Sequence, residues 1–140
     1  MKPFAFLTLA LALCTGCATV PLAPATPAQL VTRAPASDQA TIFVARPGVI
    51  GFAVLHEVLL NGAPVGALAT NTYLQLDVPP GTHTLAVNWG AKVERVQVTL
   101  ALGQQVYYRV TAVPAALSAL DPAAGARAVA RSRRAQRLDQ

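Results

Sequence analysis

The fold of this chain is decided by the stretch Thr72-Tyr73-Leu74-Gln75-Leu76-Asp77-Val78, in which polar and apolar side chains alternate. Successive side chains of an extended strand point to opposite faces of a sheet. Thr72, Leu74, Leu76 and Val78 therefore share one face, and Tyr73, Gln75 and Asp77 share the other. This alternation predicts a β-strand with one buried face and one face in water.

Similar short runs lie on both sides of this stretch. Strands are expected at residues 40–46, 52–60 and 63–68 before it, and at residues 82–89, 92–100 and 105–113 after it. Turn residues separate them, and Asn61-Gly62 is the strongest hairpin signal because both residues tolerate the positive φ angles of a type I′ turn. No run in this region has helical periodicity. We therefore predict an all-β fold, a small antiparallel β-sandwich of about seven strands.

The character of the chain changes after Pro114. Asp121 is a favourable N-cap and Pro122 a favourable first helical residue, and many of the residues that follow are alanine and arginine. Gly125 weakens the expected helix, and the arginines surround almost the whole helix. Residues 114–140 are therefore predicted to form a basic tail with a short, solvated C-terminal helix that has little apolar face for docking.

Several short motifs follow one another in the β region: Ile42 to Pro47, the Leu60-Asn61-Gly62 hairpin with Val65-Gly66, Tyr73, the Pro80-Gly81-Thr82-His83 turn, and Gly103 to Tyr108. Their order resembles the DUF2846 family of small bacterial lipoproteins. The hairpin, the Pro-Gly-x-His turn and the last of these strands are also similar to PEGA-type β domains. Residues 38–113 would then form a DUF2846-like β domain. The resemblance implies an all-β sandwich on an envelope protein, and it implies no activity.

The first residues of the chain have the pattern of an export signal. Lys2 is followed by an apolar run from Phe4 to Leu13, which has the length of a signal-peptide core and is too short to span a bilayer as a helix. Small Thr15 and Gly16 then lead into Cys17, an arrangement that resembles the bacterial lipobox, although Cys14 stands where leucine is usual. We expect residues 1–16 to be a lipoprotein signal peptide and Cys17 to carry the lipid.

Two alternatives for these cysteines remain: an ordinary cleaved signal, or a Cys14–Cys17 disulfide or metal pair. Under the lipoprotein hypothesis, residues 17–37 form a proline- and alanine-rich tether between the lipid and the domain. Ala18 is not aspartate, which by resemblance to Gram-negative lipoproteins favours the outer membrane, facing the periplasm. The membrane, reached through the N-terminal lipid, is therefore the first expected partner.

The net charge of +5 is unevenly distributed. The region from Asp38 to Asp121 is close to neutral, whereas the C-terminal segment is strongly basic. Its arginines are candidate contacts for anionic lipid or lipopolysaccharide phosphates: Arg127, Arg131, Arg133, Arg134 and Arg137. A solvated helix end is an equally good interpretation. Because the basicity is confined to this tail, the composition does not indicate a nucleic-acid-binding domain.

Few residues are candidates for chemistry. His56 and Glu57 are adjacent on a strand, so they point to opposite faces and cannot form a dyad. His83 follows a Pro-Gly turn, where a structural hydrogen bond is the better interpretation, although Asp77 flanks the same turn and could approach it. Tyr107, Tyr108 and Arg109 are the candidate ligand or partner surface, with ordinary strand packing as the alternative.

We expect a non-enzymatic binding or structural module of unassigned ligand, with no cofactor and no metal site, and an envelope protein or glycan as a further partner. The alternative is a small periplasm-facing hydrolase or glycan-binding protein with a site near His56 or His83.

Overall fold

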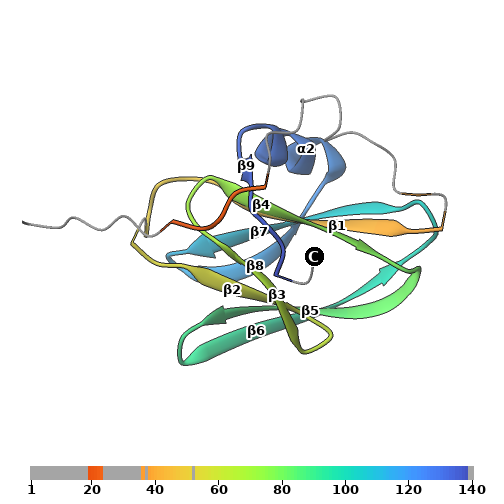
Figure 1. Ribbon diagram of the computed structural model, residues 1–140, viewed down its shortest axis with the longest axis horizontal. Helices are drawn as coiled ribbons and strands as arrows, with labels where there is room; N and C mark the ends of the chain where they lie inside the picture. Colours follow the sequence, from red (N-terminus) through yellow and green to blue (C-terminus); the bar gives the residue numbers. More distant parts are fainter. Residues whose placement is uncertain (1–18, 24–35, 37, 52, 139–140) are drawn as a thin grey trace, which may run out of the picture.

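A computed structural model describes residues 19–23, 36, 38–51 and 53–138 of the chain. Figure 1 shows two β-sheets packed face to face, with a helix on the outer side of one of them. This arrangement confirms the predicted all-β sandwich with a short C-terminal helix.

The two sheets are built from segments that alternate along the chain. The first sheet has the strand order β8-β7-β1-β4-β9, and the second has the order β3-β2-β5-β6. Most neighbouring strands are antiparallel, but β1 pairs with β7 and β4 pairs with β9 in parallel. The strand bounds are β1 Ala40–Arg46, β2 His56–Leu60, β3 Ala63–Leu68, β4 Thr72–Val78, β5 Gly81–Trp89, β6 Lys92–Leu100, β7 Gln105–Ala112, β8 Ala115–Leu120 and β9 Arg133–Arg134.

The main core lies between the sheets and uses the faces expected from the alternation. Leu74 and Leu76 of β4 are fully buried there and pack with Leu85 and Val87 of β5. Each such side chain contributes about 1.5–3 kcal/mol when it is fully buried. The hairpin between β2 and β3 also agrees with the sequence, since Asn61 and Gly62 have φ angles of 52° and 86°.

Strand β1 is buried on both of its faces. Ile42 and Val44 point into the core between the sheets, whereas Phe43 and Ala45 belong to a second apolar cluster on the other side of the sheet. The rings of Phe43 and Tyr107 are stacked in this second cluster, with centroids 4.9 Å apart. The outer face of the first sheet therefore needs an apolar cover.

Helix α2 (Pro122–Ala130) provides that cover, and the prediction of a solvated helix is wrong. Its first turn forms as expected, since the Ala124 amide donates to Asp121 Oδ1 at 2.9 Å. Gly125 and Val129 are buried against the sheet, however, so the apolar face is narrow rather than absent. Tyr73, expected in water, is only 3% exposed because it lies in the same cluster.

The segments expected to be tail and tether are in part structural. Strand β8 follows a cis Val113–Pro114 bond and pairs with β7, although the sequence indicated no strand there. Strand β9 extends the first sheet beside β4. On the N-terminal side Leu22 bridges to Ala135, and Val20 packs against the main core. The remaining tether residues, 17, 18, 24–35 and 37, and the signal segment lie outside the described residues.

Strand β2 begins at His56, four residues later than the predicted strand at 52–60. The preceding residues form part of the connection between β1 and β2. Among the described residues no helix is long and apolar enough to cross a membrane.

The contact between α2 and β7 yields a first prediction. A Cβ atom at Gly125 would overlap Cβ and Cγ of Tyr107, so Gly125→Ala should push the helix away from the sheet. The gain in helix propensity is at most about 1 kcal/mol, whereas overpacking typically costs about 1–3 kcal/mol. The overlap with Cβ of Tyr107 cannot be relieved by rotating the ring, so we expect a cost in the upper part of this range. Urea denaturation should then show a net loss of about 1–2 kcal/mol in the free energy of unfolding.

Ala130→Leu is the matched control, because it enlarges an exposed side chain of the same helix. Its free energy of unfolding should stay within about 0.5 kcal/mol of the wild type. A Gly125→Ala protein as stable as this control would contradict the proposed close packing.

Candidate functional site

The most unusual polar group in the structure is the buried guanidinium of Arg46, the last residue of β1. Arg46 is 2% exposed, and the described residues place no carboxylate against it. It instead donates to four backbone carbonyls: Ile50 at 3.5 Å, Gly51 at 2.6 Å, Val54 at 2.5 Å and Leu68 at 3.1 Å. Burial lowers the pKa of Arg46, but an arginine remains charged in proteins. One side chain therefore organises the connection between β1 and β2.

The carbonyls of this connection point toward Arg46 while several apolar side chains point outward. Val49 and Ile50 are 70% and 69% exposed, and Val54 and Leu55 are 49% and 41% exposed. Val113, in the turn between β7 and β8, is 73% exposed. The turn is close by, because a Cβ at Gly51 would lie 3.1 Å from Cβ of Ala112. We call this apolar surface, made by Val49, Ile50, Val54, Leu55 and Val113, the loop end.

His56 lies directly after the loop and is 2% exposed. Its ring packs at 5.5 Å from that of Trp89, and neither of its nitrogens has a hydrogen-bond partner within the described part of the chain. Burial lowers the pKa of His56, and the positive charge of Arg46 lowers it further. The nearby backbone of Asn88 raises the pKa, but this effect is smaller than the other two. His56 is therefore a neutral packing residue at neutral pH. Glu57 is exposed on the other face of β2, as expected.

Other polar atoms near this end of the sandwich are also enclosed. Trp89 Nε1 and Glu94 Oε2 are buried without a hydrogen-bond partner among the described residues, although Lys92 Nζ lies 3.6 Å from Glu94 Oε2. Lys92 Nζ also contacts the carbonyl of Ala115 at 3.4 Å, which ties the β5–β6 turn to β8. Three turns thus meet around the loop end.

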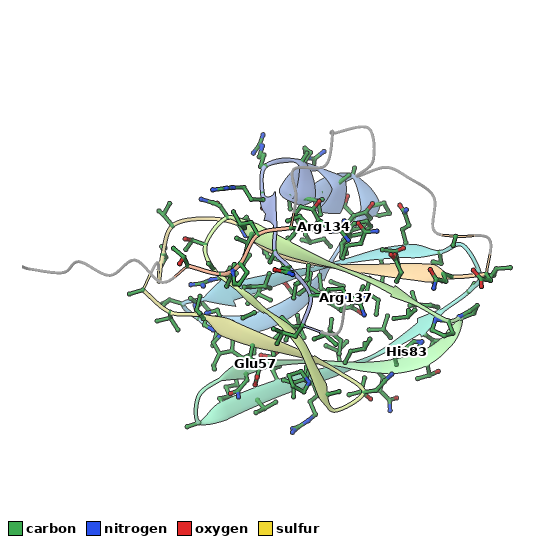
Figure 2. The ribbon with its side chains drawn as sticks, in the orientation of Figure 1. Glu57, His83, Arg134 and Arg137 are labelled. Carbon is green, nitrogen blue, oxygen red and sulfur yellow. The ribbon has the colours of Figure 1, made fainter. Side chains whose placement is uncertain are left out.

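His83 lies at the opposite end of the long axis, as Figure 2 shows. Its Nε2 is 2.8 Å from the Pro79 carbonyl and its Nδ1 is 3.0 Å from Asn61 Nδ2, so it joins two turns. Asp77 accepts a hydrogen bond from Thr41 Oγ1 at 2.7 Å and does not contact His83 in the described structure. The sequence interpretation of His83 as a turn residue agrees with this geometry. His56 and His83 therefore do not form one site.

Tyr107, Tyr108 and Arg109 do not share one face of the sheet. Tyr107 stacks on Phe43 beneath α2, whereas Tyr108 packs against the core between the sheets. Burial raises the pKa of both tyrosines. Only Arg109 is exposed. The structure therefore gives the two rings packing roles rather than a common stacking surface.

The C-terminal arginines are spread over α2, β9 and the following residues. Arg127, Arg131 and Arg133 are exposed, while Arg134 and Arg137 are partly buried. The Arg133 amide donates to the Asn71 carbonyl at 2.8 Å, and the Asn71 amide donates to the Arg46 carbonyl at 2.8 Å. The chain after α2 therefore returns to the end of the sandwich that carries Arg46. Within the described residues no group of three His, Cys, Asp or Glu side chains is suited to hold a metal.

Sequence reasoning did not identify Arg46 as a structural residue or the loop end as a surface. A charged residue closing an otherwise apolar strand, followed by Pro47-Gly48, was the available signal.

Comparisons with protein-family models and with curated proteins find no match for this chain. The resemblance to the DUF2846 family therefore stays a prediction.

The role of Arg46 can be tested by removing its charge and donors. Arg46→Met leaves the loop carbonyls without their partner, and an unsatisfied buried polar group costs about 1–3 kcal/mol. We expect the free energy of unfolding to fall by about 2–4 kcal/mol and limited proteolysis within residues 47–55 to become faster. Arg46→Lys should recover only part of the loss, because lysine lacks the planar fork of donors.

Arg109→Met is the control, since Arg109 is exposed on β7. Its stability should stay within about 0.5 kcal/mol of the wild type. Equal losses in the Arg46→Met and Arg109→Met proteins would show that Arg46 does not organise the loop.

The burial of His56 predicts a dependence of stability on pH. Its folded pKa lies below the ordinary value of 6.5, so below pH 6.5 the unfolded chain binds a proton that the folded chain does not. The contribution of His56 to stability is therefore complete above pH 6.5 and is lost as the pH falls toward the folded pKa. Denaturant titrations of wild type and His56→Leu should show a steeper loss below pH 6.5 in the wild type. Parallel pH profiles would contradict a buried neutral imidazole.

Proposed function

We propose that this chain is a lipid-anchored protein of the bacterial cell envelope whose β-sandwich is a non-enzymatic binding or structural module. The observation that carries the proposal is Cys17, which follows a short apolar run and the small residues Thr15 and Gly16. In proteins with this kind of signal the cysteine thiol receives a diacylglycerol and becomes the first residue of the mature chain. Two or three acyl chains anchor a protein stably in a bilayer.

The packing of residues 19–23 bears on how a lipid on Cys17 would hold the domain. The Gln136 amide donates to the Pro21 carbonyl at 2.9 Å, and the Ala23 amide donates to the Arg134 carbonyl at 3.0 Å. Residues 19–23 are thus attached to the domain instead of serving as a free spacer. A lipid on Cys17 would hold the β-sandwich close to the membrane surface.

The positions of the two histidines support a module rather than the alternative hydrolase. His56 is enclosed beside Trp89, and His83 joins two turns through its ring nitrogens. Both therefore have packing or turn roles in the described structure. We propose an envelope protein or glycan as a partner of the module, the periplasmic side of the outer membrane as its location, and kinship with the DUF2846 family.

Metabolic labelling with palmitate tests this proposal. Cys17→Ala should abolish incorporation of the label, and the protein should accumulate as uncleaved or soluble precursor. Cys14→Ala is the matched control and should be labelled and retained in the membrane fraction like the wild type. Unchanged labelling of the Cys17→Ala protein would refute the lipoprotein assignment.

A further inference from the structure

The loop end gathers apolar side chains that the fold leaves without a cover. Within the described residues the other exposed large apolar side chains are Leu102 and Leu138, which stand singly elsewhere. Several exposed apolar side chains gathered at one end of a small domain are typical of a contact with a membrane or a partner. Val49, Ile50 and Val113 are each about 70% exposed, so packing within the sandwich does not explain why these positions are apolar.

Arg46 explains why these side chains stay outward. It draws the carbonyls of Ile50, Gly51 and Val54 toward the interior. The backbone is thereby fixed, and the apolar side chains on its outer side cannot collapse onto the core without breaking those hydrogen bonds. The hydrogen bonds of Arg46 therefore keep the apolar side chains of the loop end exposed.

The chain brings a lipid to the same end of the molecule. In Figure 1 the segment 19–23 runs from β9 toward the end of the long axis at which the β1–β2 connection lies. Cys17 is two residues before Thr19, and two residues span at most about 7 Å. An acyl group on Cys17 would therefore enter the bilayer from the same end of the long axis as the loop end.

The distribution of charge favours the same orientation. Arg131 and Arg133 follow α2 at the end that carries Arg46, and Lys92 contacts Ala115 beside the β7–β8 turn. Asp38, Asp77 and Asp121 lie toward the opposite end, near the start of β1 or the end of β8. Glu57 and Glu94 lie near the loop end, and Glu94 is 3.6 Å from Lys92. Basic groups beside an apolar tip suit a surface with anionic head groups.

We propose that the loop end inserts its apolar side chains into the bilayer that holds the N-terminal lipid, so that the β-sandwich stands end-on at the membrane. Arg131, Arg133 and Lys92 then lie at the level of anionic head groups. The proposal rests on the lipid anchor of Cys17 for its orientation, and it adds a second, non-covalent contact made by the folded domain. The far end, with His83 and the β6–β7 turn, is left facing away from the membrane and free to meet a partner.

Environment-sensitive probes test this orientation in the full acylated chain. A nitrobenzoxadiazole label is attached through Ile50→Cys or, as the matched control, through Leu102→Cys, which is a similarly exposed apolar residue at the opposite end. The proteins are reconstituted in vesicles of phosphatidylethanolamine and phosphatidylglycerol. We expect blue-shifted, several-fold stronger emission at position 50, quenched by lipids with a nitroxide on the acyl chain, and neither effect at position 102.

Three results would overturn the proposal. Equal emission at the two positions would show that the domain does not dock through the loop end. A shift at position 50 that is independent of vesicles and grows with protein concentration would assign this surface to a second copy of the chain. A blue shift at position 50 without quenching by the lipid nitroxide would assign the loop end to a contact with a protein.

The anchor and the docking surface can fail separately. Palmitate labelling of the same samples reports on Cys17 alone. If the label is absent, the proposed anchor fails, and both probes are placed in the Cys14→Ala, Cys17→Ala chain and mixed with the same vesicles. Blue-shifted, quenchable emission at position 50 would then support docking by the loop end itself, and its absence would overturn the inference.

Discussion

The structure depends on the burial of β1 from both sides. Its residues Ala40 to Arg46 are all buried, so the first sheet cannot present its outer face to water. The sandwich needs a third layer over Phe43 and Ala45, and α2 supplies it through Gly125 and Val129. The C-terminal segment is for this reason part of the folded domain, and with it come β8, β9 and the contact between Leu22 and Ala135.

The burial of β1 extends to its last residue, Arg46, and thereby determines the conformation of the exposed loop that follows. Arg46 continues the buried strand, and within the described residues its charge is balanced by the dipoles of backbone carbonyls rather than by a carboxylate. Burying an ion in this way is costly unless its donors are satisfied, so the connection after β1 must wrap around the guanidinium. The exposed apolar side chains of Val49 and Ile50 are a consequence of that wrapping. Core packing and the surface proposed to meet the membrane are thus parts of one arrangement.

Local patterns predicted much of the fold. The strand at Thr72–Val78 and the Asn61-Gly62 turn are properties of a few adjacent residues, and both are confirmed. The face of β4 expected in water is covered, however, because Tyr73 is buried and Gln75 and Asp77 are half-buried. The start of α2 at Asp121 was equally visible, but its docking was not, because a narrow face of Gly125 and Val129 has meaning only opposite Tyr107. The tyrosine pair shows the same limit, since the sequence left the choice between a ligand surface and strand packing open. Their partners, Phe43 and the inter-sheet core, lie far away in the chain.

The sequence by itself determined the positions of β1 to β7, the tight hairpin and the helix start, because each depends on neighbouring residues. The proposed signal with Cys17 rests on the same kind of local pattern. Only the tertiary structure decided that β1 and β7 run in parallel, that the C-terminal segment covers the sheet, and that Arg46 binds carbonyls up to Leu68. It also decided that Val113 lies beside the loop after Arg46. These features join residues widely separated in sequence, and their free energy comes from burial and hydrogen bonds that exist only when the sheets have closed.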